Sequence, residues 1–436
     1  RATIDSRSPD FPLILMRIYL LSVATALLSA VSASAIDTQW SVSYNGVQYE
    51  RQQSGDAAPV VVARGMTDLN AQSVSIAASV NFPNPETGEG QQEYITLPVD
   101  EVGMSFAAGS KSLRTVTVSA GVKIINDMAF AGCENLESAS IGEGCDSIGA
   151  GAFSRCRALS SISLPASVSK LGTEIFLDCS SLASAGLGGA VSIPFKTFQH
   201  CTALTSVQAA NAVRIHQYAF DGCTSLTSFT VQPTVEIIES GAFDDCTALA
   251  EIVFAETSAE IVLRGGPFPA GTLREVKIHR PVLASADAFG RQYKCTRLLI
   301  GPYASFTVTD ATRSATPFFA GFTGLREIGV NCLTPPPIEQ PLFAESVFAQ
   351  AILKVPAQSV ASYRNAPYWQ QFATIEAGNF AGTDHLALNP DPCEYRIEGN
   401  RLIAADYWKN ARIIDLSGRC LGRLHDGSFR LPYRGI

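Results

Sequence analysis

Apolar and polar positions recur with a fixed period through most of this chain. The clearest unit places Phe, Cys and Leu at every third position, followed by a short stretch of alternating apolar and small polar residues. Equivalent residues of consecutive units lie 22 or 23 positions apart, which is typical of a solenoid of stacked repeats. Six consecutive units carry the motif in full, with Phe130, Phe153, Phe176, Phe198, Phe220 and Phe243, and Cys133, Cys156, Cys179, Cys201, Cys223 and Cys246.

Each repeat has three parts, of which the Phe-x-x-Cys-x-x-Leu turn is the first. A strand of the form Leu-x-x-apolar-x-apolar follows, and a return segment carries one apolar residue five positions before the next Phe, as at Ile148. Alternation turns one side of each strand inward, and a single repeat cannot cover that side, so neighbouring repeats must share one core. We therefore predict a β-rich repeat solenoid with a parallel β-sheet on one face, rising ~4.8 Å per repeat.

The amino-terminal end of the array needs its own cover, because a terminal repeat has no neighbour on one side. Residues 36–103 are expected to form an N-terminal β cap and the first rung. Strand-like alternation over 40–49, with the turn signal Asn45-Gly46, predicts a β-hairpin cap, and residues 74–76 predict the first rung. Residues 81–90, rich in Pro and Gly, predict a surface loop.

The solenoid itself is expected to span residues 104–376. Its repeats loosen toward the carboxyl end, where the aromatic stretch 359–372 is predicted to cap the last open edge. Residues 377–393 are expected to be a linker, and residues 394–436 a small C-terminal β-module with glycine turns.

The amino terminus has the pattern of a targeting segment. A positive start at Met16-Arg17, an apolar run and the small residues Ala33-Ser34-Ala35 predict a signal peptide within residues 1–35, with an upstream extension and cleavage after Ala35. The apolar run is too short to span a bilayer comfortably, and no other stretch predicts a membrane span. We therefore expect a protein that is exported to the cell surface or secreted.

Composition and charge limit the partners of the chain. The 436 residues are 46% apolar and carry a net charge of −8, which argues against a nucleic-acid surface, since phosphates need a basic face. The five histidines show no metal-ligand spacing, and no nucleophile elbow or phosphate-binding glycine loop is present. We expect a monomer without a cofactor.

Three glutamates raise the question of an enzyme on a solenoid scaffold. Glu251, Glu275 and Glu327 occupy similar outward positions, but catalytic carboxylates would have to face one substrate bond. Arg274 and Arg326 stand beside two of them, and about three repeats are expected to separate Glu275 from Glu327. Surface ion pairs are the better interpretation, so we predict that the protein is not an enzyme.

The column of cysteines has two interpretations, a stack of disulfides or metal sites and a column of small buried thiols. Stacked repeats would hold parallel cysteine side chains ~4.8 Å apart, wider than the ~3.8 Å typical between disulfide Cβ atoms. We predict free thiols that pack as small hydrophobic groups beside the Phe column.

The outward positions of the strands carry a second pattern, a stripe of hydroxyls with few charges. In the simplest interpretation these small residues pair well across neighbouring strands. The functional hypothesis is a recognition surface for an extended polymer, and a weaker one is ice binding, which Gly186, Gln208 and Val253 would interrupt. The candidate residues are Thr115, Thr117, Ser138, Ser140, Ser161, Ser163, Ser184, Ser206, Gln208, Ser228 and Thr230.

The repeated Ala-Phe-x-x-Cys-x-x-Leu-x-x-Ile-x-Leu unit resembles the BspA-like leucine-rich repeat family of bacterial surface proteins. The resemblance covers residues 74–375, and 353–369 is similar to the terminal unit of such arrays in Bacteroidetes proteins. The stretch 414–436 is similar to small C-terminal modules of their secreted proteins, some of which are sorting signals. The resemblance implies a surface or secreted adhesion protein that binds a host matrix protein, a bacterial partner or a glycan. The alternative is a structural spacer without a dedicated ligand.

Overall fold

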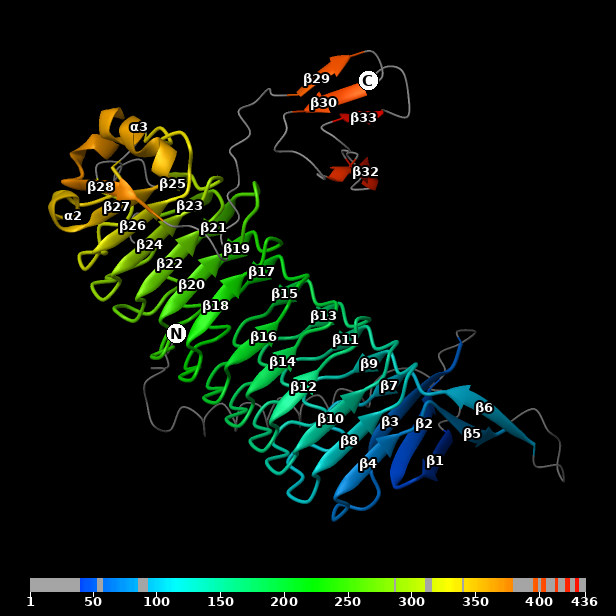
Figure 1. The fold of residues 1–436 in the computed structure, drawn as a ribbon. Helices are drawn as coiled ribbons and strands as arrows, with labels where there is room; N and C mark the ends of the chain where they lie inside the picture. Colours follow the sequence, from blue (N-terminus) through cyan, green and yellow to red (C-terminus); the bar gives the residue numbers. More distant parts are fainter. Residues whose placement is uncertain are drawn as a thin grey trace.

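The chain folds into an elongated β-solenoid of about 12 turns, with parallel sheets along its length and little helix (Figure 1). The computed structural model describes residues 40–52, 58–84, 93–285, 288–309, 316–338 and 341–378, together with the backbone of short strands between residues 395 and 430. The expected signal peptide lies outside the described residues. The predicted fold class is confirmed.

The longer strand of each turn belongs to one parallel array, here called the main sheet. Its strands are β4 (Ser73–Ile76), β8 (Thr115–Val118), β10 (Ser138–Ile141), β12 (Ser161–Ser163), β14 (Ser184–Gly186), β16 (Ser206–Gln208), β18 (Ser228–Val231), β20 (Glu251–Phe254), β22 (Glu275–Ile278), β24 (Arg297–Ile300), β26 (Glu327–Val330), β27 (Ile352–Val355) and β28 (Thr374–Ala377). Pairing is parallel and in register, so that Ser138 faces Thr115 one repeat earlier. β4, where the first rung is expected, pairs with β8.

The return segments form a second parallel array, which the sequence pattern did not predict. Its strands are β3 (Val60–Met66), β7 (Glu101–Val102), β9 (Ile124–Ile125), β11 (Ser147–Ile148), β13 (Lys170–Leu171), β15 (Ser192–Ile193), β17 (Arg214–Ile215), β19 (Ile237–Ile238), β21 (Ile261–Leu263), β23 (Val282–Ala284) and β25 (Phe306–Val308). Most contain two or three residues, too few to show an alternation in sequence. The solenoid is therefore closed by paired strands on both sides.

Two antiparallel hairpins build the amino-terminal end. β1 (Trp40–Tyr44) pairs with β2 (Val47–Gln52) as expected, and Asn45 and Gly46 between them both have positive φ, which suits a two-residue hairpin turn. β2 pairs with β3, so this hairpin extends the second array. β5 (Ser79–Pro83) pairs with β6 (Tyr94–Pro98), so the loop expected at 81–90 is wrong over its first residues. The reason is that Val80 and Phe82 are buried, which holds β5 against the core.

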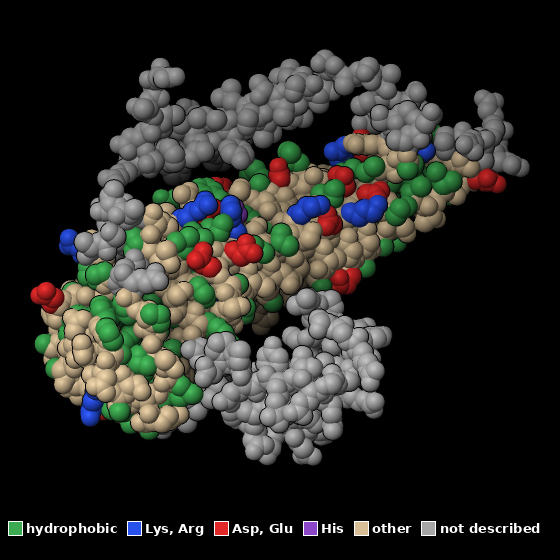
Figure 2. Space-filling view, turned by 90° about the horizontal axis from the view of Figure 1, so that it is seen from above, with side chains coloured by type: hydrophobic (Ala, Val, Ile, Leu, Met, Phe, Trp, Pro, Cys, Tyr) green, Lys and Arg blue, Asp and Glu red, His purple; other side chains and the backbone are tan. Residues whose placement is uncertain are grey.

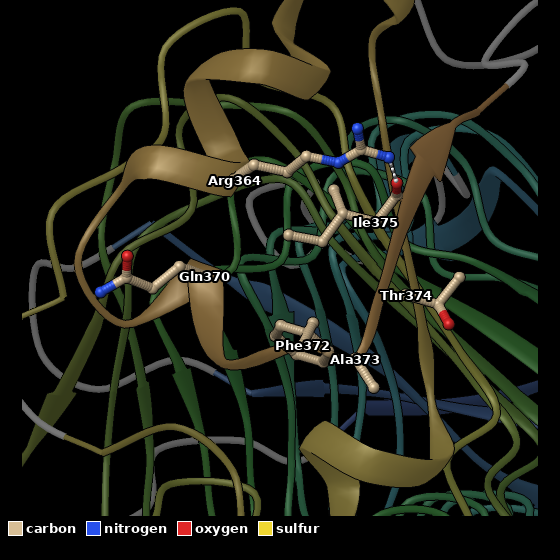
Figure 3. A pocket seen from close by; sticks show the side chains of 6 residues that line it. All are labelled: Arg364, Gln370, Phe372, Ala373, Thr374 and Ile375. Carbon is tan, nitrogen blue, oxygen red and sulfur yellow. Dashed lines mark hydrogen bonds between the residues drawn. The ribbon is translucent and has the colours of Figure 1, made fainter.

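Short helices and aromatic side chains cover the other end, as predicted. They are α2 (Glu345–Gln350), η2 (Ala357–Ser359), α3 (Val360–Asn365) and η3 (Trp369–Gln371). Tyr363 and Trp369 are buried, and each donates a hydrogen bond to a backbone carbonyl, Tyr363 Oη to Cys332 and Trp369 Nε1 to Pro336. Arg364 Nη2 donates to Ile375 O at 3.0 Å, beside an open hollow next to β28 (Figure 3).

The C-terminal region contains β29 (Tyr395–Glu398), β30 (Arg401–Ala404), β31 (Arg412–Ile414), β32 (Cys420–Arg423) and β33 (Ser428–Arg430). β29, β30 and β33 form one antiparallel sheet, and β31 pairs with β32. Strands thus occupy the region expected to be a β-module. The start of the expected linker belongs to β28, and residues 379–394 lie outside the described residues.

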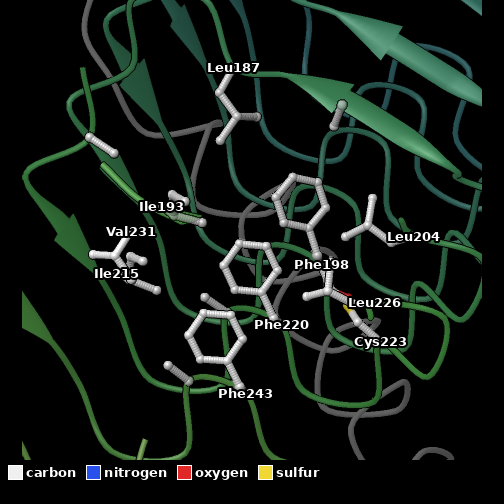
Figure 4. Packing of buried hydrophobic residues seen from close by; sticks show 14 of the residues in the cluster. Leu187, Ile193, Phe198, Leu204, Ile215, Phe220, Cys223, Leu226, Val231 and Phe243 are labelled. Atoms are coloured by element: carbon white, nitrogen blue, oxygen red, sulfur yellow. The ribbon is translucent and has the colours of Figure 1, made fainter. Parts of the chain in front are cut away.

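A column of stacked phenylalanine rings runs through the core between the two arrays. Neighbouring rings from Phe130 to Phe243 lie 5.0 to 6.0 Å apart between centroids and are nearly parallel, as the rings of Phe198 and Phe220 show in Figure 4. The column continues through Phe268 and Phe289, which the sequence pattern missed because their spacing changes to 25 and 21 residues. All six predicted Phe residues are fully buried.

Each complete turn bends at two left-handed backbone positions, two residues before and two residues after its Phe. Around Phe176 these are Glu174 and Asp178, both with φ of 59°. Gly151 fills the first position one repeat earlier, but most of these positions carry a side chain. Left-handed φ is costly for such residues, so the stacking of neighbouring turns must hold them in place.

Beyond β20 a single buried arginine ties the less regular repeats together. Arg280 has no exposed surface and donates to the backbone carbonyls of Gln232, Pro233, Ala259 and Glu260 at 3.1 to 3.4 Å. Burial lowers its pKa. The guanidinium thus donates hydrogen bonds to the carbonyl groups of two loops, which lie outside the paired strands.

Candidate binding surface

The six predicted cysteines lie in the core as free thiols. Each donates a hydrogen bond to a backbone carbonyl of the preceding repeat, for example Cys156 Sγ to Phe130 O at 3.3 Å and Cys179 Sγ to Phe153 O at 3.1 Å. Burial raises the pKa of Cys133 to about 11 and that of Cys179 to about 12. A thiol so rarely ionised is a poor nucleophile, so this column serves packing.

The eleven predicted outward residues form one uncharged surface on the main sheet, here called the hydroxyl face. All eleven are exposed, in two rows that run along the solenoid from β8 to β18. In the described part of the chain none of these side chains takes part in a hydrogen bond, so their polar groups are free. Ser73 and Ser75 on β4 extend both rows by one rung and were missed because an inserted hairpin separates them from the regular repeats.

The same face changes character at β20, where a chain of ion pairs begins. Lys277 lies 2.9 Å from Glu251, Arg297 lies 3.1 Å from Glu275 and 3.0 Å from Glu327, and Lys354 lies 2.9 Å from Glu327. The surface ion pairs expected for the glutamates are therefore present. Figure 2 shows basic and acidic side chains side by side along the molecule, with uncharged areas between them.

Two details of the ion pairs expected for the glutamates are wrong. The partners of Glu275 and Glu327 are not their sequence neighbours Arg274 and Arg326. Glu275 and Glu327 are two rungs apart rather than about three, because β24 alone lies between β22 and β26 and carries Arg297 between the two carboxylates. Residues one repeat apart face each other across paired strands, whereas Arg274 and Arg326 lie just before the strands that carry the glutamates.

Two of the histidines, His200 and His216, each lie beside one carboxylate. His200 Nδ1 lies 2.9 Å from Asp178 Oδ1, and its side chain is 56% exposed. His216 Nδ1 lies 3.5 Å from Glu239. Among the residues that the structure describes, no group of three or more His, Cys, Asp or Glu side chains could hold a metal ion. Those residues also include no helix long and apolar enough to cross a membrane.

Parallel strands, stacked Phe rings and a repeated Leu in each turn define a leucine-rich-repeat solenoid. The family model described as "BspA type Leucine rich repeat region (6 copies)" matches residues 100–192 and 191–264. The repeats between residues 100 and 264 are therefore of the BspA leucine-rich-repeat type. No curated protein matches the sequence.

Several solved structures of bacterial leucine-rich-repeat proteins are similar to this chain. A leucine rich cell surface protein from Faecalibacterium prausnitzii A2-165 is 18% identical, with 79% of this chain and 96% of that chain covered and a TM-score of 0.42. A leucine-rich repeat protein from Bacteroides ovatus ATCC 8483 is 19% identical, with 78% and 100% covered and a TM-score of 0.43.

Proposed function

We propose that this chain is a secreted or cell-surface interaction protein that binds an extended ligand on the hydroxyl face. Export would depend on the signal peptide predicted within residues 1–35, with cleavage after Ala35. The ligand is a host matrix protein, a bacterial partner or a glycan. The match of residues 100–264 to the BspA-type leucine-rich repeat region supports such an interaction role.

The observation that carries this proposal is the free hydrogen-bonding capacity of the hydroxyl face. Its eleven polar side chains are exposed, uncharged and without hydrogen bonds inside the described part of the protein. They stand on short strands whose neighbours and Phe column hold them in place. A rigid polar surface loses little conformational entropy when a ligand binds, so its hydrogen bonds contribute to affinity.

The test is a screen of the full chain against matrix proteins and glycans, repeated with a variant of the face. Ser161→Lys, Ser163→Lys and Ser184→Glu together block the centre of both rows. Positions 161 and 184 face each other across neighbouring strands, so the opposite charges introduced there preserve pairing. We expect the variant to fold and to lose the ligand. Ser181→Glu, on an exposed turn, is the control and should bind as the wild type does.

Two results would contradict the proposal. If the folded triple variant keeps every interaction that the wild type makes, the hydroxyl face is not the site. If the wild type binds nothing in the screen, the alternative gains support, in which the solenoid is a structural spacer of the cell surface.

A further inference from the structure

Two exposed arginines lie at equivalent positions, immediately before β22 and β26. Arg274, Thr296 and Arg326 occupy the same place in three consecutive repeats, because the amide of Thr296 donates to Arg274 O and that of Arg326 to Thr296 O. The backbones of the two arginines are therefore about 10 Å apart, two rungs of the solenoid. Exposed Lys294 precedes Thr296 by two residues. Arg274, Lys294 and Arg326 are here called the basic strip.

The charges of the basic strip have no acidic partner among the described residues. Glu275 and Glu327, the carboxylates closest in sequence, are bound to Lys277, Arg297 and Lys354. Arg326 makes one contact with the carbonyl of its neighbour Leu325, and Lys294 lies over the Tyr293 ring. The strip therefore presents three uncompensated cations on a chain with a net charge of −8.

The equivalent position in the first repeats shows the opposite arrangement. Arg114 also stands immediately before a strand of the main sheet, but it forms an ion pair with Glu137 of the next repeat. Lys111 likewise pairs with Glu134 at 2.9 Å. An arginine at this position can therefore form an ion pair, whereas Arg274 and Arg326 have no acidic partner among the described residues.

An exposed aromatic ring lies within the basic strip. The side chain of Tyr293 is 56% exposed, and the nitrogen of Lys294 lies 5.8 Å from the centre of its ring. The flanking repeats have glycines at this turn: a Cβ on Gly271 would lie 2.5 Å from the ring, and one on Gly324 would lie 2.1 Å from Tyr293 O. Because Gly271 and Gly324 have no side chain, the neighbouring repeats do not cover the ring of Tyr293 at these two positions.

We propose that the basic strip binds an acidic polysaccharide, a linear glycan that carries carboxylate or sulfate groups. The planar guanidiniums of Arg274 and Arg326 suit such anions, which accept two parallel hydrogen bonds. Tyr293, in the repeat between theirs, offers a ring with an apolar surface and a polar tip, on which the face of a sugar ring can pack. The glycan chain runs along the solenoid axis, across successive repeats.

Other anionic polymers fit this surface less well. An extended peptide binds by adding a strand to a free sheet edge or by filling pockets, but β22, β24 and β26 are each paired on both sides. A single strand of nucleic acid is held by several aromatic rings on which successive bases stack, whereas the described residues of the strip offer one exposed ring, that of Tyr293. The strip lies outside the hydroxyl face, so this inference does not depend on the proposed function.

The test measures binding of the full chain to immobilised chondroitin sulfate and polygalacturonate, with dextran as the uncharged control. We expect both acidic glycans to bind, less tightly at high salt, and dextran not to bind. The double variant Arg274→Gln, Arg326→Gln should bind about tenfold more weakly, because two charged hydrogen-bond donors are lost. Tyr293→Ala should also weaken glycan binding.

A matched control separates the site from the net charge. The double variant Lys111→Gln, Arg114→Gln also removes two positive charges, but at the other end of the solenoid. It should bind the acidic glycans as tightly as the wild type does. Circular dichroism melts should show that both double variants fold, since all four side chains are exposed.

Three results would overturn the inference. The first is no binding of the wild type to either acidic glycan at low salt. The second is an equal loss in the two double variants, which would show a general charge effect. The third is tighter binding of an acidic peptide or a single-stranded oligonucleotide than of both glycans, which would assign the strip to another class of ligand.

Discussion

Alkaline pH will destabilise this solenoid through its buried thiols. The perturbation is a rise from about pH 8 to about pH 10, one unit above the ordinary thiol pKa of 9.0. Burial raises the pKa of Cys133 to about 11, and that of Cys179 and Cys295 to about 12. Over this range the unfolded chain loses these protons while the folded chain keeps them, so the free energy of unfolding falls as pH rises.

The size of the effect follows from the number of thiols. One unit above its ordinary pKa, each thiol that stays protonated in the folded state lowers the free energy of unfolding by about 1.4 kcal/mol. Three such thiols lower it by about 4 kcal/mol, a large part of the 5–15 kcal/mol typical of folded proteins. Burial also raises the pKa of Cys156 and Cys201, which adds to the loss.

The assay is urea unfolding followed by circular dichroism at several pH values, with a reductant present. Cys179→Ala serves as the comparison, because it removes one thiol while lysines and tyrosines titrate equally in both proteins. This variant should be less stable at about pH 8, yet lose about 1.4 kcal/mol less between about pH 8 and 10. The same pH dependence in both proteins would refute the argument that this thiol is buried and protonated in the folded chain.

Three further predictions concern the packing of the repeats. Phe198→Ala should lower the free energy of unfolding by about 3–5 kcal/mol in urea titrations, and Phe195→Ala, at a partly buried position, by less. Arg280→Met should cost about 1–3 kcal/mol, because the hydrogen bonds from its guanidinium to partly buried backbone carbonyls are lost, and a loss no larger than that of exposed Arg264→Met would contradict this role. Glu174→Gly should raise the melting temperature, with about 0.5–1 kcal/mol gained at its left-handed φ, and Gly151→Ala, at the equivalent position, should lower it.

The two halves of the main sheet differ in a way that bears on binding. From β8 to β18 the outward positions carry no Lys, Arg, Asp or Glu, whereas from β20 onward charged residues pair with one another across the rungs. A ligand on the charged half would have to displace ion pairs, whereas a ligand on the hydroxyl face finds free donors and acceptors. The proposed functions therefore fall on separate surfaces, the hydroxyl face and the basic strip.

The period of the sequence by itself determined the solenoid, the inward residues and the outward stripe. A strand shows one side to the core, and stacking places equivalent residues of all repeats in columns. Residues equivalent to Phe130 and Cys133 in the other repeats are therefore also expected to point inward. The hairpin turn at Asn45 and Gly46 was equally readable, since few residues accept positive φ. The strands of the second array could not be predicted from the sequence, because a strand of two or three residues shows no alternation of apolar and polar positions.

Only the tertiary structure decided which charges are compensated. In sequence, Glu275 adjoins Arg274, but Glu275 lies on β22 and Arg274 lies before it, and Arg297, 22 positions away on the next strand, is the partner of Glu275. The reason is the geometry of a parallel sheet, in which the residue one rung away lies ~4.8 Å distant on the same face while the next residue along the chain points elsewhere. Arg274 and Arg326 are thereby left without an acidic partner in the part of the chain that the structure describes, and this feature of the surface emerges only when the repeats are stacked.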